Sequence, residues 1–322
     1  MTTYPIYTIG EALIDFIPKT NGQALADVDA FERQAGGAPA NVAAAVAKLG
    51  GKSTFLGQVG RDAFGEHLLE TLRDAGVETK HVKTTKEAPT ALAFVSLKKD
   101  GERDFTFFRN PSADMLYGAK DLPKDVLKKG ILHFCSVSLI DAPIKDAHVK
   151  AIETMKAKGG LISFDPNVRL PLFKSEKACL AAIRPFLKQA DLLKVAEDEL
   201  HFITGKPRKQ NAIKALFNEG IEGLIITKGK DGAEWWNKVG LLAECEGETV
   251  DVVDTTGAGD AFIGAILHQL SHENLDLANI DEQKAENMLA FANHVAAHTT
   301  TKKGAIRAFP SQKDIKNHTK ER

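Results

Sequence analysis

The sequence predicts an α/β fold with a mainly parallel central sheet. Short apolar, β-branched segments alternate with amphipathic helical segments, which is the pattern of successive βαβ units. Several of these segments are apolar at consecutive positions, as expected when helices cover both faces of a sheet. The length of 322 residues allows one large domain with a smaller appendage.

The central strands are predicted at the short apolar runs, and the helices at the segments between them that end in or near Gly or a charged turn. The predicted strands are residues 7–9, 54–59, 131–134, 161–164, 192–195 and 224–227. The predicted helices are residues 38–49, 63–75, 143–158, 176–188, 212–219, 258–269 and 282–298.

Two stretches break this alternation, because they are strand-like without an intervening helix. They are residues 16–31 and 90–108, and we expect them to pair into a small accessory sheet. The second contains Lys99-Asp100-Gly101, and Asp-Gly tolerates the positive φ of a tight hairpin. A further hairpin is predicted at residues 234–244.

Composition excludes several classes of protein. A formal net charge of −1, without a basic cluster, argues against a general nucleic-acid binder. No apolar run approaches the roughly 20 residues of a membrane span, and residues 1–7 do not resemble a signal peptide. The three cysteines fit neither a zinc site nor a redox pair, so we expect a reducing compartment.

The strongest motif is Gly257-Ala258-Gly259-Asp260, which follows an acidic, Thr-rich turn and leads directly into an apolar helix. The glycines let backbone N–H groups converge at a helix N-terminus, where the helix dipole favours phosphate. Asp260, in the first helical turn, is placed to accept a proton from a hydroxyl nucleophile. The alternative is an ordinary N-cap, because Asp is favoured at helix starts.

Other nucleotide-binding motifs are excluded. A dinucleotide fingerprint would need a third glycine where Phe262 stands. Gly51-Lys52-Ser53 matches only the end of a P-loop and follows a helix instead of a strand, so a P-loop is excluded as well.

A second motif places Gly36 and Gly37 before an Ala-rich helix, with Asn41 near the helix start. The glycines permit close approach of a ligand to the backbone, and the Asn41 amide offers a donor and acceptors. The alternative is a helix that packs tightly on the sheet through its Ala face.

Together, residues 36–41 and 254–260 resemble the two signatures of the PfkB carbohydrate kinase family, also called ribokinase-like. The resemblance covers residues 1–322 as a single kinase domain. It implies a three-layer α/β/α body and a β-sheet lid formed by segments at about 16–34 and 88–112. It also implies ATP-dependent phosphorylation of a sugar hydroxyl.

The resemblance implies a role for each matching residue on the acceptor side. Asp260 matches the catalytic base, and the backbone of residues 257–259 matches an anion hole. Asp15, expected on the first strand, matches an acceptor of sugar hydroxyl protons. Gly36, Gly37 and Asn41 match further sugar contacts.

The resemblance also implies a nucleotide side with ATP, Mg²⁺ and K⁺. Glu199 matches a glutamate that acts on Mg²⁺ through ordered water, although Ala196 stands where the family usually has Asn. The backbone carbonyls of Asp254 and Thr256 match a monovalent-cation site. The matching nucleotide contacts are Lys194, Thr227, Gly229, Gly232 and Asn293.

Two further segments bear on the sugar. Residues 108–116 resemble the fructokinase branch, and residues 165–173 resemble fructokinases and 2-keto-3-deoxygluconate kinases alike. Arg109 and Arg169 each offer a rigid donor fork to hydroxyls or phosphate, the alternative for Arg169 being a salt bridge to Asp165. Because residues 108–116 resemble the fructokinase branch, fructose is the expected acceptor.

Several alternatives stay open. Within the same chemistry the acceptor alternatives are 2-keto-3-deoxygluconate, ribose, tagatose phosphate and a nucleoside such as aminoimidazole riboside. A non-catalytic sugar sensor of the same fold is the alternative from another class. By resemblance, we expect a cytoplasmic homodimer that pairs through the lid and binds neither nucleic acid nor membrane.

Overall fold

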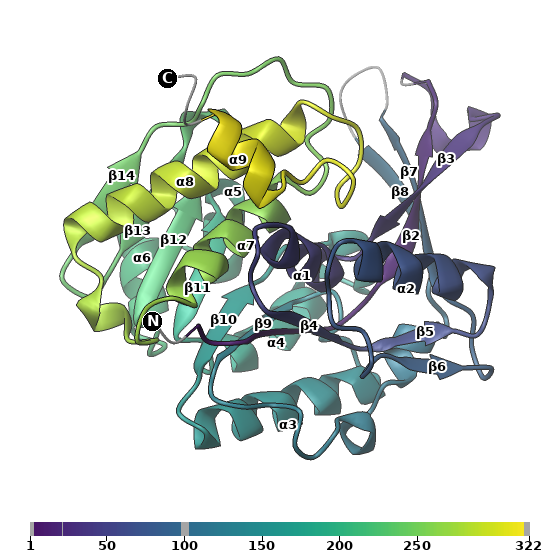
Figure 1. The fold of residues 1–322 in the computed structure, drawn as a ribbon, viewed down its shortest axis with the longest axis horizontal. Coiled ribbons are helices and arrows are strands. Elements are labelled where there is room, and N and C mark those ends of the chain that lie inside the picture. The colour runs from purple at the N-terminus through teal and green to yellow at the C-terminus, as the bar shows by residue number, and fades with distance from the viewer. Residues whose placement is uncertain (1–2, 21, 98–102, 319–322) are drawn as a thin grey trace.

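The structure, a computed structural model, describes residues 3–20, 22–97 and 103–318 (Figure 1). A large sheet with the strand order β14-β13-β12-β11-β10-β9-β1-β4 forms its centre. The strands from β12 to β4 in this order are parallel, and β13 and β14 continue the sheet antiparallel, which confirms the predicted hairpin. The strands are β1 (Ile6–Ile9), β4 (Ser53–Leu56), β9 (Ile131–Cys135), β10 (Leu161–Asp165), β11 (Leu192–Ala196), β12 (Gly223–Thr227), β13 (Ala233–Trp236) and β14 (Leu241–Cys245).

Helices cover both faces of this sheet, as the sequence predicts. Successive strand residues alternate between two separate cores; for example, Ile131 packs in one core and Leu132 in the other. The first core is closed by α1 (Ala38–Lys48), α2 (Ala63–Asp74), α7 (Ala258–Leu270) and α8 (Glu282–Thr300). The second core is closed by α3 (Pro143–Ala157), α4 (Glu176–Leu187), α5 (Glu197–Thr204) and α6 (Lys209–Phe217). A short helix, α9 (Gln312–His318), follows near the C-terminus.

The accessory sheet is confirmed as well. It has the strand order β3-β2-β7-β8 and projects from the body at the upper right of Figure 1. Its strands are β2 (Leu13–Pro18), β3 (Phe31–Gly36), β7 (Ala91–Leu97) and β8 (Arg103–Phe108). The expected turn at Lys99-Asp100-Gly101 lies outside the described residues.

Two predictions about strands were wrong in detail. Residues 54–59 form two strands, because β5 (Gln58–Gly60) leaves the central sheet and pairs with β6 (Lys83–Thr85). The break falls at Gly57, where a Cβ atom would stand 2.6 Å from the Gly10 carbonyl oxygen. Asp15 lies on β2 of the accessory sheet and not on the first strand, since β1 ends at Ile9 before Gly10, whose φ is 146°.

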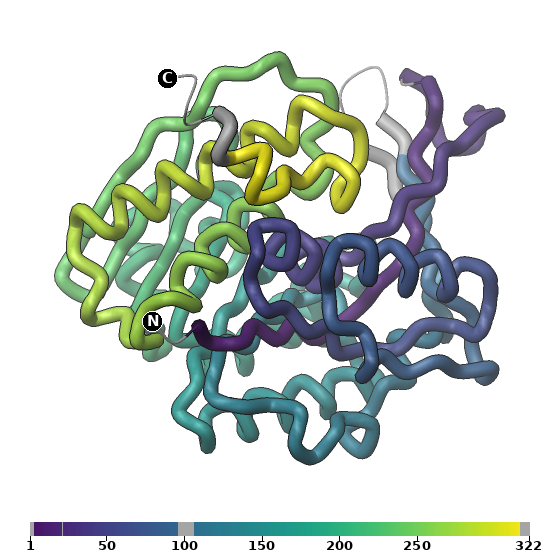
Figure 2. The backbone as a smooth tube through the Cα atoms, viewed as in Figure 1, coloured from purple at the N-terminus to yellow at the C-terminus, as the bar shows by residue number. Residues whose placement is uncertain are grey.

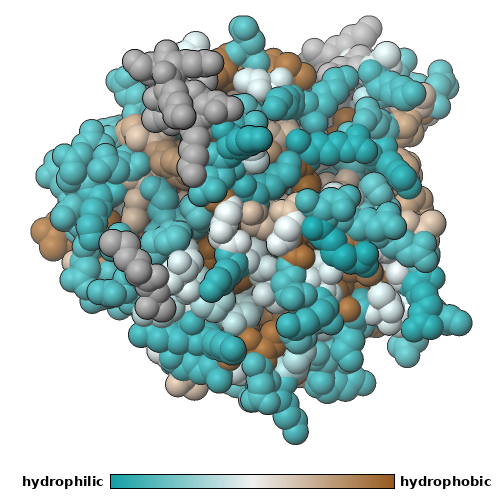
Figure 3. Space-filling model, in the orientation of Figure 1, coloured by the Kyte–Doolittle hydropathy of each residue, from teal (hydrophilic) through white to brown (hydrophobic). Residues whose placement is uncertain are grey.

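Hydrophilic side chains cover most of the face shown in Figure 3, with scattered hydrophobic ones between them. Among the described residues, no helix combines the length and the apolar composition needed to cross a membrane.

Candidate active site

A cavity of about 490 Å³ opens at the carboxyl ends of the central strands, beside the accessory sheet. In α/β proteins this edge of the sheet is the usual place for a ligand, and the volume suits a small molecule. Predicted residues from both ends of the chain line this cavity: Asp15, Gly37, Asn41, Arg169, Lys194, Asp254, Thr256, Gly257, Gly259 and Asp260.

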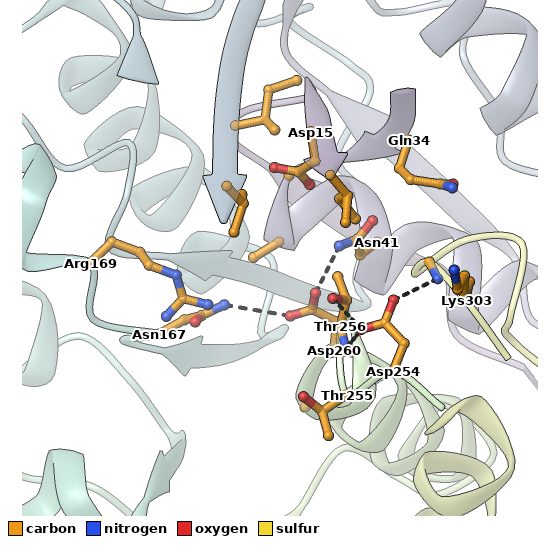
Figure 4. Close-up of a pocket in the computed structure, with 18 of the residues that line it drawn as sticks. Asp15, Gln34, Asn41, Asn167, Arg169, Asp254, Thr255, Thr256, Asp260 and Lys303 are labelled. Atoms are coloured by element: carbon orange, nitrogen blue, oxygen red, sulfur yellow. Dashed lines mark hydrogen bonds between the residues drawn. The ribbon is translucent and has the colours of Figure 1, made fainter. Parts of the chain in front are cut away.

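Two helix N-termini meet at the centre of the cavity wall. The small residues of α1 and α7 let the two helices pack closely, since a Cβ atom at Gly264 would stand 2.7 Å from the Ala45 Cβ atom. The two helices lie side by side in Figures 1 and 2, although their colours show how far apart they are in the sequence. Asn41 in the second turn of α1 therefore reaches Asp260 in the first turn of α7, and Asn41 Nδ2 donates to Asp260 Oδ2 at 2.8 Å (Figure 4).

The Asp260 side chain is 7% exposed. Burial raises its pKa to about 7; the Asn41 hydrogen bond opposes this rise, and the nearby Asp165 carboxylate adds to it. A carboxyl group with a pKa near neutrality can exchange a proton with a substrate hydroxyl at physiological pH.

Asp15 enters the cavity from the accessory sheet. Burial raises the pKa of its carboxyl group to about 7, Arg169 opposes the rise, and Asp260 adds to it, so the two carboxyl groups share one electrostatic environment. Gly36 leaves the room that this side chain needs, because a Cβ atom there would stand 2.1 Å from Asp15 Oδ2. Gly37 has a φ of 99°, and its Cβ atom would stand 2.5 Å from the Glu11 carbonyl oxygen.

The start of α7 has the backbone conformation that the motif predicts. Gly257 is the N-cap with a φ of 78°, and Ala258 is the first helical residue. A Cβ atom at Gly257 would stand 2.6 Å from the Ala305 Cβ atom. The open backbone N–H groups and the positive end of the helix dipole make this turn suitable for an anion.

A buried cation faces this helix start. Lys194 Nζ lies 3.4 Å from the position that a Cβ atom would take at Gly259, and it pairs with Asp165 Oδ2 at 3.0 Å. Burial disfavours the charged lysine, but Asp165 and Glu199 outweigh it, so the pKa of Lys194 lies above its usual value. The site therefore keeps a positive charge beside the turn at the start of α7.

Glu199 does not line the cavity. Its carboxylate accepts the backbone N–H groups of Ala196, at 2.9 Å, and Val168, at 2.5 Å. Burial and the neighbouring Asp165 raise the pKa of Glu199. Glu199 thereby joins the end of β11, at Ala196, to the loop after β10, at Val168.

The two arginines have different surroundings. Arg169 lines the cavity and donates to the Val168 carbonyl at 3.0 Å, while Asp165, its predicted alternative partner, pairs with Lys194. Arg109 lies outside the cavity lining. Its buried guanidinium pairs with Asp114 and donates to the Val137 carbonyl at 3.2 Å.

Apart from Lys194, which lines the cavity, the predicted nucleotide contacts lie farther along the same edge of the sheet. Thr227 ends β12, and Gly229 and Gly232 take positive φ in the turn that follows. Asn293 on α8 donates to the carbonyls of Cys245, at 3.2 Å, and Glu246, at 3.0 Å. These four residues surround the end of the β12–β13 turn and do not line the main cavity.

The two loops of the predicted cation site are joined through Asp254. Its Oδ1 accepts the Thr256 N–H at 2.9 Å and the Thr256 hydroxyl at 2.7 Å, and its Oδ2 accepts the Gly304 N–H at 2.9 Å. The Asp254 carboxylate therefore fixes the loop before α7 to the loop after α8.

Sequence reasoning missed three residues of the site. Glu11 lines the cavity and accepts the Ser138 hydroxyl at 2.6 Å, Asp165 anchors Lys194, and Asn167 lies beside Asp260. Asp165 and Asn167 stand directly after a predicted strand, so their position at the carboxyl edge of the sheet was the available signal.

The fold and the cavity together define a ribokinase-like α/β kinase. Residues 5–312 match the pfkB family carbohydrate kinase, and the chain belongs to this family.

Its relatives include fructokinases. The chain is 47% identical to "Probable fructokinase-5" of Arabidopsis thaliana, over 96% of this chain and 95% of the relative. It is 44% identical to "Fructokinase-2" of Oryza sativa subsp. japonica, over 95% and 91%. Its fold matches the crystal structure of fructokinase with bound ATP from Xylella fastidiosa (TM-score 0.88, 34% identity, 98% of each chain). It also matches fructokinase from Vibrio cholerae O395 in its fructose-, ADP- and calcium-bound form (TM-score 0.88, 35% identity, 98% of each chain).

Proposed function

We propose that this protein is an ATP-dependent fructokinase that converts D-fructose to fructose 6-phosphate. One observation carries the proposal: Asp260, buried at the start of α7, lies between the anion-binding turn and the cavity that Asp15 enters. The fructokinase relatives and the fructose- and ATP-bound neighbours support the choice of substrates.

In this reaction Asp260 takes the proton of the primary hydroxyl as that hydroxyl attacks the γ-phosphorus of ATP, and the bond between this phosphorus and the β–γ bridging oxygen breaks to release ADP. The backbone N–H groups of residues 257–259 and the Lys194 ammonium stabilise the negative charge of the transferring group. Asp15, the Gly36–Gly37 backbone, Asn41 and Arg169 hold the sugar. Arg109 acts from behind the cavity wall, where its charge lies near Glu11.

A lid completes this proposal. The accessory sheet, with its apolar residues Leu13, Val95 and Phe107 on the cavity, closes over the sugar and excludes water, which would otherwise compete for the phosphoryl group. The body and this lid act as one kinase domain.

The residues present fit a magnesium ion that is held mainly by the nucleotide. Among the described residues no group of three or more His, Cys, Asp or Glu side chains is arranged to hold a metal. Mg²⁺ is commonly bound through substrate phosphates, water and one or two carboxylates. Glu199 would act through such water, and the bound ion would neutralise phosphate charge.

A potassium ion fits between the loops that Asp254 joins, with the Asp254 and Thr256 carbonyls as ligands. The crystal structure of a fructokinase double mutant from Vibrio cholerae O395 in its fructose-, ADP- and potassium-bound form supports the choice of this ion. Turnover measured in KCl should exceed turnover in NaCl at equal ionic strength, and equal rates would exclude the site.

A coupled ADP-release screen over sugars tests the substrate. Fructose should give the highest kcat/KM, above 2-keto-3-deoxygluconate, ribose, tagatose phosphate and aminoimidazole riboside. A tenfold preference for any of these would replace fructose as the acceptor. No sugar-dependent ADP release, with sugar binding intact, would instead support the non-catalytic sensor.

The protein acts as a cytoplasmic homodimer in this proposal. On the accessory sheet, Phe94 stacks on Phe16 with ring centroids 4.6 Å apart and packs edge-on against Phe108, which is 59% exposed. A second copy would cover this aromatic face. Light scattering should give twice the monomer mass for the wild type and the monomer mass for Phe108→Glu; a monomeric wild type would exclude the dimer.

A further inference from the structure

The turn after β10 has an unusual backbone. Asn167 has a φ of 44°, one of two positive values at non-glycine residues in the described part of the chain. Asn tolerates this conformation better than most residues, yet it still costs energy and persists where its surroundings enforce it.

Three separate contacts enforce the turn. Asp165 Oδ1 accepts the Asn167 N–H at 3.1 Å, Glu199 Oε1 accepts the Val168 N–H at 2.5 Å, and the Pro166 carbonyl accepts the Ser136 N–H at 3.1 Å. The other oxygen of Asp165 is held by Lys194 at 3.0 Å. The backbone at residue 167 is thus tied to the same buried ion pair that faces the start of α7.

The enforced conformation directs the Asn167 side chain to Asp260. Asn167 Nδ2 lies 3.5 Å from Asp260 Oδ1, while Asn41 Nδ2 lies 2.8 Å from Asp260 Oδ2 (Figure 4). The two amides approach different oxygens of the carboxylate and come from different parts of the chain. Asn41 holds one oxygen tightly, and Asn167 lies at the limit of hydrogen-bonding distance from the other.

We propose that Asn167 is a positioning residue that orients the Asp260 carboxylate, so that Oδ1, its less tightly held oxygen, receives the proton of the substrate hydroxyl. This rests on the proposed role of Asp260 as the base. A fixed carboxylate plane keeps the accepting lone pair directed at the hydroxyl, and small losses of such alignment lower the rate of the chemical step.

The test uses variants that separate the amide from the backbone. Asn167→Gly accepts the positive φ and removes only the amide, and Asn167→Asp keeps the shape but removes the donor and adds charge. Leu275→Gly is the matched control, because Leu275 has a φ of 59° and lies outside the cavity lining. Thermal melts verify that each variant is folded.

Asn167→Gly should lower kcat about 10- to 100-fold, with the KM for ATP within about twofold of wild type. Asn167→Asp should also shift the rise of kcat/KM with pH to higher pH, because the added negative charge makes Asp260 harder to deprotonate. The other groups whose charges interact with Asp260 are Asp15, Asp165, Arg169 and Lys194, and all stay unchanged. Leu275→Gly should keep the wild-type kcat.

A double-mutant cycle completes the test. In the Asp260→Asn background, Asn167→Gly should cause no further loss, because the residue acts through Asp260. Wild-type kcat in Asn167→Gly, or losses that add in the double variant, would overturn the proposal. If the wild type phosphorylates no sugar, the proposed function fails, and the positioning role is decided by the ¹³C NMR titration of the Asp260 carboxyl. A midpoint unchanged between wild type and Asn167→Asp would overturn it.

Discussion

Asn41 Nδ2 donates to Asp260 Oδ2 at 2.8 Å, although 219 residues separate the two side chains in the sequence. The contact joins the two motifs that identify the family, and it depends on the close packing of α1 against α7. It also has a chemical effect, since the hydrogen bond opposes the rise in the pKa of Asp260 that burial causes. The pKa of the Asp260 carboxyl group therefore depends on residues of both α1 and α7.

Asp260→Asn should abolish most turnover. A positioned general base contributes about 10²- to 10⁴-fold to rate, so kcat for fructose should fall by at least about 100-fold. The ATP affinity, measured by calorimetry, should stay within about twofold. Near-normal turnover in this variant would refute the assignment of Asp260 as the base.

The pH dependence follows from the same carboxyl group. Only the deprotonated Asp260 accepts a proton, so kcat/KM should rise with pH through about 7 and then level off. Asp15, with a pKa of about 7, titrates in the same range, so the rise of kcat/KM with pH should reflect the titration of both carboxyl groups together. A flat profile between pH 5.5 and 8 would contradict this prediction.

Stability should show the opposite trend. The pKa of Asp260 is about 7 in the folded protein and 3.8 in the unfolded chain. The free energy of unfolding should therefore fall as the pH rises from about 4 to about 7, because the folded protein loses a proton there that the unfolded chain has already released. Asp260→Asn removes the cost and should raise the Tm at pH 8, with the difference disappearing toward pH 4. A lower Tm at pH 8 would show that burial of the charge is not the dominant effect.

Removing Lys194 should expose the cost of an unpaired buried charge. Lys194→Met leaves Asp165, which is 1% exposed, without its cation, so the free energy of unfolding should fall by about 3–5 kcal/mol. Adding Asp165→Asn should restore most of the stability but not the turnover. Urea denaturation measures the first effect and ADP release the second. If Lys194→Met and the wild type had the same free energy of unfolding, the Lys194–Asp165 ion pair would not be needed to stabilise the buried Asp165 carboxylate.

Gly36→Ala should act on sugar binding. Its Cβ atom would stand 2.1 Å from Asp15 Oδ2, and the end of that side chain would move away. The KM for fructose should rise about tenfold or more, since a hydrogen bond to a charged group contributes about 1.5–3 kcal/mol. Gly118→Ala is the control, because its nearest contact would be an ordinary 3.6 Å. An unchanged KM in Gly36→Ala would argue against Asp15 as a sugar ligand.

Much of the fold followed from patterns that depend on local sequence. Apolar runs and helical spacing located the central strands and helices, and the absence of helical spacing located the accessory sheet. The prediction failed at residues 54–59, where the chain leaves the central sheet at Gly57. At this point the backbone lies so near Gly10, which is distant in the sequence, that a Cβ atom would not fit.

The site was predictable where a motif carries its chemistry in consecutive residues, as at residues 257–260. The place of Asn167 directly after a predicted strand indicates the right edge of the sheet, but its direction toward Asp260 depends on a positive φ, which the sequence does not display. Arg109 was expected at the sugar, but its guanidinium is taken by Asp114 five residues along the chain, a pairing that only the folded loop decides.

The carboxylates at the cavity belong to different parts of the fold: Asp260 is carried by a helix of the body, and Asp15 by a strand of the accessory sheet. If these two residues act as proposed, exchange of accessory-sheet residues around Asp15 should change how the alcohol is bound without changing the start of α7. Such modularity offers evolution, and protein engineers, a route to new sugar kinases that begins from this scaffold.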